Sequence, residues 1–145
     1  MNQDQNVVQE ALGVAARMLE AYGFEIVTED RRLFPQFEPS LAVLKDRRLL
    51  VFAASAYSSA DLFLRPEELN EIREDLESLI AANQPSKDDR VREVEKIALV
   101  VTPGEITMAS AEGDIKWLVV ETADEVPEEM DRLFSPELRG KIRPT

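Results

Sequence analysis

The chain has 145 residues, 44% of them hydrophobic and 32% charged, which are the proportions of a soluble globular protein with one full-sized core. It contains neither cysteine nor histidine, which excludes disulfide bonds, Cys/His zinc sites, thiol nucleophiles and Ser-His catalytic pairs. The net charge of −12 argues against binding to nucleic acid or anionic lipid.

No apolar run approaches the roughly 18 residues that a membrane-spanning helix needs. The N-terminal sequence MNQDQN is polar and lacks the basic and apolar regions of a signal peptide. We therefore expect a single domain over residues 1–145, in the cytoplasm and without a membrane segment.

The first expected element is a helix that is capped by Asp4 or Asn6 and runs to about Tyr22. Its apolar residues recur at spacings that place them on one helix face: Val8, Leu12, Ala15, Leu19 and Tyr22. Gly23 follows directly and suits the position just after a helix. The segment Phe24–Thr28 alternates in polarity and is rich in β-branched residues, so it predicts the first strand.

Two apolar strands joined by a charged tip dominate the middle of the chain. The strands are expected near Leu41–Leu44 and Leu49–Ala56, and the tip is the KDRR segment between them. A continuous apolar run such as Leu49–Ala54 is typical of a strand that is buried on both faces. The connection before this hairpin contains Pro35 and Pro39, which oppose regular strand pairing.

Phe34 and Phe37 lie in the same connection. The interpretation that we prefer is that they close the edge of the core. The alternative is that they form a contact patch on the surface.

A second helix is expected from Pro66 to about Ala82 or Asn83. Its buried stripe consists of Leu69, Ile72, Leu76, Leu79 and Ile80. The opposite face is acidic and is most simply solvated. The polar segment Asn83–Arg92 that follows is the loop that we expect to be most mobile.

Three further strands are expected, at Lys96–Thr102, Ile106–Ala109 and Lys116–Glu121. Trp117, the one tryptophan, favours a core position over a ligand platform. A short helix at Pro127–Phe134 and a loosely ordered tail at 135–145 complete the expected chain.

The order helix, three strands, helix and strand resembles the αβββαβ core of the PD-(D/E)XK, or restriction-endonuclease-like, nuclease superfamily. The segment Glu10–Val27 resembles that family's opening helix and first strand, and Leu41–Phe52 resembles the hairpin that holds its active site. The resemblance covers about residues 7–102. It implies a single three-layer α/β domain in which helices flank a central mixed sheet.

In that family an acidic residue begins the second strand and an (Asp/Glu)-X-Lys triplet lies on the third, where they bind Mg²⁺ and activate the attacking water. Aligning Leu49–Phe52 with the apolar part of the third strand places the triplet at Ala54–Ala56 and the first acid near Ser40 or Leu41. None of these residues carries a carboxylate or an ammonium group. We therefore expect no catalytic residue, no metal site and no cofactor.

The chain has one basic grouping near the hairpin: Arg31, Arg32, Lys45, Arg47 and Arg48. If the end of the first strand lies beside the hairpin tip, these cations could form a patch that meets phosphates or an acidic partner surface. A solvated surface is the simpler interpretation. Together with Phe34 and Phe37, the grouping is the interaction surface that we would test first.

The leading hypothesis is a pseudo-nuclease, a non-catalytic nuclease-like domain that acts by protein–protein contact as a regulatory or accessory subunit. It predicts a protein partner, whereas nucleic acid is not expected, and it leaves homo-oligomerisation open. Two alternatives remain. One is a divergent metal-dependent nuclease that uses Glu10 or Glu38, the only nearby acids, and the other is a weak nucleic-acid-binding protein that uses the basic grouping.

Overall fold

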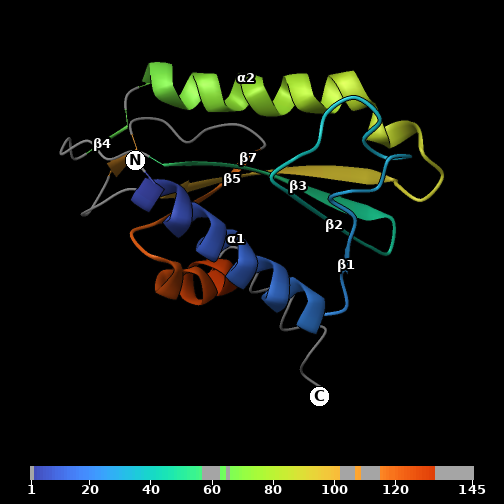
Figure 1. Ribbon diagram of the computed structural model, residues 1–145. Coiled ribbons are helices and arrows are strands. Elements are labelled where there is room, and N and C mark those ends of the chain that lie inside the picture. Colours follow the sequence, from blue (N-terminus) through green and yellow to red (C-terminus); the bar gives the residue numbers. More distant parts are fainter. Residues whose placement is uncertain (1, 57–62, 65, 102–106, 109–114, 133–145) are drawn as a thin grey trace.

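The computed structural model describes residues 2–56, 63–64, 66–101, 107–108 and 115–132. A five-stranded mixed sheet lies between two layers of helices (Figure 1). Helix α1 (Asn2–Ala21) covers one face, together with the 3-10 turn η2 (Ala123–Glu125) and a helical segment at 126–132. Helix α2 (Pro66–Asn83) covers the other face. The three-layer α/β fold predicted from the sequence is therefore confirmed.

The sheet has one antiparallel strand, β2, between a short edge strand and three parallel strands. Its order is β1 (Glu25–Ile26), β2 (Leu41–Lys45), β3 (Arg48–Ala56), β5 (Glu93–Val101) and β7 (Ile115–Val120). A separate parallel pair joins β4 (Phe63–Leu64) to β6 (Thr107–Met108). The predicted order of helix, three strands, helix and strand is confirmed, with β4 added before α2.

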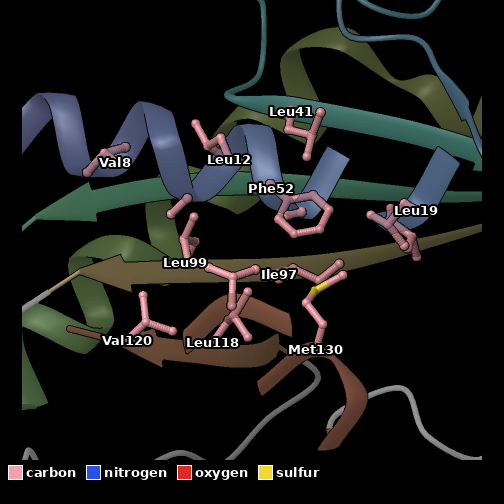
Figure 2. Close-up of a cluster of buried hydrophobic side chains, with 14 of the residues drawn as sticks. Val8, Leu12, Leu19, Leu41, Phe52, Ile97, Leu99, Leu118, Val120 and Met130 are labelled. Atoms are coloured by element: carbon pink, nitrogen blue, oxygen red, sulfur yellow. The ribbon is translucent and has the colours of Figure 1, made fainter. Parts of the chain in front are cut away.

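One half of the core lies between the sheet and α1. The helix stripe predicted from Val8, Leu12 and Leu19 is buried and points at the strands (Figure 2). It meets side chains from alternate positions of the sheet, among them Phe52 of β3, and also Met130 from the helical segment at 126–132. This period-two pattern is what a strand imposes on its two faces.

The other half of the core lies between the sheet and α2. Ile72 and Leu76 of α2 belong to the same buried cluster as Val51 and Val100 of the sheet. Trp117 also belongs to this cluster and is 5% exposed, so its predicted core position is confirmed. Because β3 and β5 are buried on both faces, their continuous apolar runs are explained.

The first strand is shorter than predicted, because both ends of the segment Phe24–Thr28 turn away from the sheet. The Phe24 N–H bonds back to the Leu19 carbonyl at the end of α1. The Val27 N–H still donates to Ala42 in β2, but the Val27 carbonyl accepts the Asp30 N–H in a turn. Local hydrogen bonds at a helix end and a turn thus replace ladder bonds on both sides of β1.

Other predicted boundaries need smaller corrections. Helix α1 begins at Asn2, so Asp4 and Asn6 lie within the helix and the predicted cap was wrong. It ends at Ala21, and Gly23 has a φ of 98°, as expected just after a helix. The predicted tail at 135–145 lies outside the described residues.

Candidate functional site

The end of the hairpin where β2 begins and β3 ends is where the family resemblance places an active site. The pairing of Leu41 with Phe52 brings Ser40 to the last residues of β3. The Ala54 N–H donates a hydrogen bond to the Ser40 Oγ over 3.2 Å. The structure thus brings two of the predicted catalytic positions into contact, and the groups that meet there are a hydroxyl and a backbone amide.

Glu10 and Glu38, the two acids named as alternative ligands, are both exposed. Glu10 lies on α1 and Glu38 lies in the connection before β2. Across the part of the chain that the structure describes, acidic side chains do not gather in groups of three or more that could hold a metal ion.

The opposite end of the hairpin is its charged tip. Asp46 and Arg47 both have left-handed backbones, with φ angles of 53° and 67°. This is the conformation of a two-residue type I′ turn, which favours Asn or Asp followed by Gly. The Arg47 carbonyl accepts the Arg92 N–H over 2.6 Å and the Glu93 N–H over 3.1 Å, which fixes the tip to the start of β5.

A shallow hollow of about 660 Å³ opens beside this tip. Its lining consists of Gly23, Glu25, Leu44, Lys45, Asp46, Arg47, Asp89 and Arg90. Three of these residues are basic and three are acidic, so the hollow is mixed in charge. Of the predicted basic grouping, Lys45 and Arg47 line this hollow.

Lys45 has a structural contact in addition to its place at the rim. Its Nζ donates to the Tyr22 carbonyl at the end of α1 and lies 5.6 Å from the centre of the Phe24 ring. A cation at a helix C-terminus stabilises the carbonyl groups that have no partner within the helix. Lys45 thus joins the hairpin tip to the first helix.

Arg48 is also engaged. Its Nε donates to Glu95 Oε2 on β5 over 2.5 Å, and both side chains are about three-quarters buried. The pair bridges the two neighbouring parallel strands at the tip end of the sheet. We therefore assign Arg48 to the packing of the fold, whereas the neighbouring Arg47 side chain is exposed.

Phe34 and Phe37 have different surroundings although they are three residues apart. Phe34 is 3% exposed and belongs to the core cluster beside α2, which confirms the preferred interpretation for that residue. Phe37 is 59% exposed, so that interpretation is wrong for it. Arg31, Phe34 and Phe37 line one small pocket of about 30 Å³, and both Arg31 and Arg32 are exposed.

Sequence reasoning missed Asn83, the last residue of α2, which is 6% exposed. Its Oδ1 accepts the N–H groups of Gln36 and Phe37, over 2.8 and 3.1 Å. Its Nδ2 donates to the carbonyls of Phe37 and Leu79. Asn83 therefore holds the backbone on both sides of the exposed Phe37 ring and keeps that ring on a fixed turn.

Arg90 was also missed, and it bridges two carboxylates. Its Nη1 lies 2.8 Å from Asp30 Oδ2, and its Nη2 lies 3.0 Å from Asp88 Oδ2. Hydrogen bonds from Arg90 lower the pKa of Asp88 to about 2 and also lower the pKa of Asp30. Arg90 and Asn83 thus hold both ends of the loop predicted to be mobile, and the sequence gives no local signal that pairs residue 90 with Asp30.

Comparison with known proteins adds no relative. No protein-family model matches the chain, and no curated protein or solved structure matches it significantly. Within the described residues, neither long helix is apolar enough to cross a membrane.

Proposed function

We propose that this chain is a non-catalytic domain of the restriction-endonuclease-like type that acts by protein–protein contact, as a regulatory or accessory subunit in the cytoplasm. The observation that carries the proposal is the contact between Ser40 and Ala54. Those two positions meet where the family would hold carboxylates, and neither side chain supplies the negative charge that holds Mg²⁺ or the basic group that activates water there.

The order of the elements supports the same proposal. A helix precedes three strands of which the middle one is antiparallel, and a second helix then leads to a parallel strand beside β3. This arrangement agrees with the αβββαβ core. A shared fold carries no activity by itself, because activity depends on the groups at the site.

Arg47 is the residue that we assign to partner contact at the hairpin tip. It is exposed at the rim of the mixed-charge hollow, and it keeps a left-handed backbone that glycine would adopt at lower cost. Keeping a long cationic side chain at a strained turn suggests a use for that side chain. We assign Phe37 to the apolar part of the partner contact, because Asn83 holds the exposed ring on a fixed turn.

The experiment is affinity capture of partners by the full chain from lysate of its native cells, with nuclease treatment to remove bridging nucleic acid. The test variants are Arg47→Glu and Phe37→Ser. Arg48→Glu is unsuitable, because it would place two carboxylates together at Glu95 and perturb the fold. Arg17→Glu is the matched control, since Arg17 is an exposed cation on α1 and the charge change is the same.

We expect a stoichiometric protein partner that survives nuclease treatment, is lost with Arg47→Glu or Phe37→Ser, and is retained with Arg17→Glu. If the captured proteins are lost after nuclease treatment, the proposal is contradicted and nucleic-acid binding is favoured. If both test variants retain the partner, the chain still acts by protein–protein contact, but Arg47 and Phe37 do not make that contact.

A further inference from the structure

A small pocket lies in the connection between β1 and β2, beside the C-terminal end of α2 (Figure 1). It has a volume of about 30 Å³, and its lining consists of Thr28, Glu29, Arg31, Phe34, Gln36, Phe37 and Glu38. The Phe37 ring and the carboxylates of Glu29 and Glu38 are exposed at this pocket. Aromatic rings and carboxylates both attract cations, so two kinds of group in the lining favour the same ligand.

The Phe37 ring is held at the pocket by an ordered backbone. Asn83 accepts the N–H groups of Gln36 and Phe37 and donates to the Phe37 carbonyl. The chain leading to this turn is also closed, because the Phe34 N–H donates to the Asp30 carbonyl over 2.9 Å. A preformed site loses less conformational entropy when its ligand binds. The 59% exposure of Phe37 therefore makes its ring available at a site that is already formed.

The charge around the pocket selects the sign of its ligand. Among the described residues, neither Glu29 nor Glu38 takes part in an ion pair. Two carboxylates and one guanidinium, that of Arg31, leave the lining with a net charge of −1. The whole chain carries a net charge of −12. The lining and the field of the protein thus both attract a cation, whereas an anion would have Arg31 alone in its favour.

The size of the pocket selects the shape of that cation. A volume of about 30 Å³ holds about two water-sized groups. A lysine side chain ends in a compact ammonium group on a methylene stem, which matches this size. The larger, planar guanidinium of arginine needs more room.

We propose that this pocket takes the ammonium group of a lysine side chain on the protein partner. The Phe37 ring contacts the end of that side chain, and the carboxylates of Glu29 and Glu38 balance its charge. This inference rests on the proposed function, and it adds the kind of residue that the partner brings to Phe37.

Nuclear magnetic resonance of the full chain tests the pocket without the partner. The probe is the blocked tripeptide acetyl-Gly-Lys-Gly-amide, and the readout is the shift of the backbone N–H signals of Gln36 and Phe37. We expect a dissociation constant on the order of millimolar, because exposed cation–π contacts and ion pairs are individually weak. Added salt should weaken the binding further. The same peptide with arginine at its centre should bind more weakly, and the peptide with glutamate should cause no shift.

Variants of the lining separate its contacts. Phe37→Leu keeps an apolar side chain but removes the ring, and it should weaken binding of the lysine peptide about two- to fivefold. Glu29→Gln and Glu38→Gln should each weaken it about twofold, and Arg31→Gln should strengthen it about twofold. Glu71→Gln is the matched control, since it removes the same charge at an exposed position of α2 and should have no effect. All of these side chains are exposed, so the circular dichroism spectrum should be retained.

Several results would overturn the proposal. If Phe37→Leu leaves binding unchanged, or if Glu71→Gln weakens it as much as Glu38→Gln, the lysine does not bind in this pocket. If the arginine peptide binds as tightly as the lysine peptide, the choice of lysine is wrong. If the glutamate peptide shifts the same signals, the expected sign of the ligand is wrong.

This titration and the capture of a partner can fail separately. If a protein partner is captured but the lysine peptide does not bind, the inference about the pocket is wrong and the proposed function stands. If the lysine peptide binds but no protein partner is captured, the proposed function is wrong although the pocket binds lysine.

Discussion

The two ends of the β2–β3 hairpin differ in the chemistry of their side chains. At one end, Ser40 accepts a hydrogen bond from Ala54, and both groups are neutral. At the other end, Lys45 and Arg47 line the same hollow as Arg90, which bridges Asp30 and Asp88. The fold thus places neutral residues where the family resemblance expects catalysis, and charged residues where we propose a partner contact.

Two side chains, Asn83 and Arg90, hold the long connection between β1 and β2. Asn83, which is buried, binds that connection around Phe37 through hydrogen bonds between neutral groups. Arg90 binds it at Asp30 through partly exposed ion pairs. These two contacts differ in kind, and they therefore predict different responses to mutation and to pH.

The largest expected effect is the loss of the buried contact. Asn83→Ala removes four hydrogen bonds and leaves the backbone groups around Phe37 without their partner. We expect a decrease of about 2 to 3 kcal/mol in the free energy of unfolding, measured by urea denaturation. Asn70→Ala, at an exposed position of the same helix, is the matched control and should change stability by less than about 0.5 kcal/mol.

The next effect is a dependence of stability on acid pH. Because the pKa of Asp88 is lowered from 3.8 to about 2 in the folded chain, its stabilisation is complete above pH 3.8 and is lost as the pH falls through about 2. Asp30 shifts in the same direction, so its contribution has the same sign. Since the bridge is partly exposed and screened by solvent, we expect a loss of about 1 kcal/mol.

This loss should depend on Arg90, and urea midpoints measured across the acid range would show it. Arg90→Ala should lower stability near neutral pH and flatten the decline at acid pH. Arg92→Ala, an exposed cation in the same loop, should keep the decline of the unmodified chain. If stability declines equally at acid pH in all three proteins, the Arg90 bridge is not the cause of the decline.

The smallest expected effect has the opposite sign. Arg47→Gly places glycine at a φ of 67° and should raise the free energy of unfolding by about 0.5 kcal/mol while weakening partner capture. Asp46→Gly is the control, because aspartate tolerates this conformation better and should give a smaller gain. A loss of stability with Arg47→Gly would show that the arginine supports the turn and would weaken its assignment to partner contact.

Periodicity and apolar runs predicted the larger elements well. The stripe from Val8 to Leu19 and the continuous run of β3 have the burial that those patterns indicate. Shorter features were missed because they depend on local hydrogen bonds at the ends of elements. The shortening of β1 by Leu19 and Asp30 is an example.

The contacts of the candidate site were less predictable, because they join residues far apart in the sequence. Asn83 meets Phe37 across 46 positions, and Arg90 meets Asp30 across 60. Composition also does not separate Phe34 from Phe37 or Arg47 from Arg48. In each pair one side chain faces the protein and the other faces solvent, and the direction of the backbone in the folded chain decides which.

The claim that the neutral end of the β2–β3 hairpin is not catalytic is tested most directly by a nuclease assay. The full chain would be assayed with DNA and RNA substrates in Mg²⁺ and in Mn²⁺. Glu10→Gln and Glu38→Gln would be assayed beside the unmodified chain, since these are the acids that a divergent site would use. We predict that cleavage by all three proteins is equal and does not depend on the metal. Metal-dependent cleavage that disappears in either variant would contradict the account and identify the chain as a nuclease.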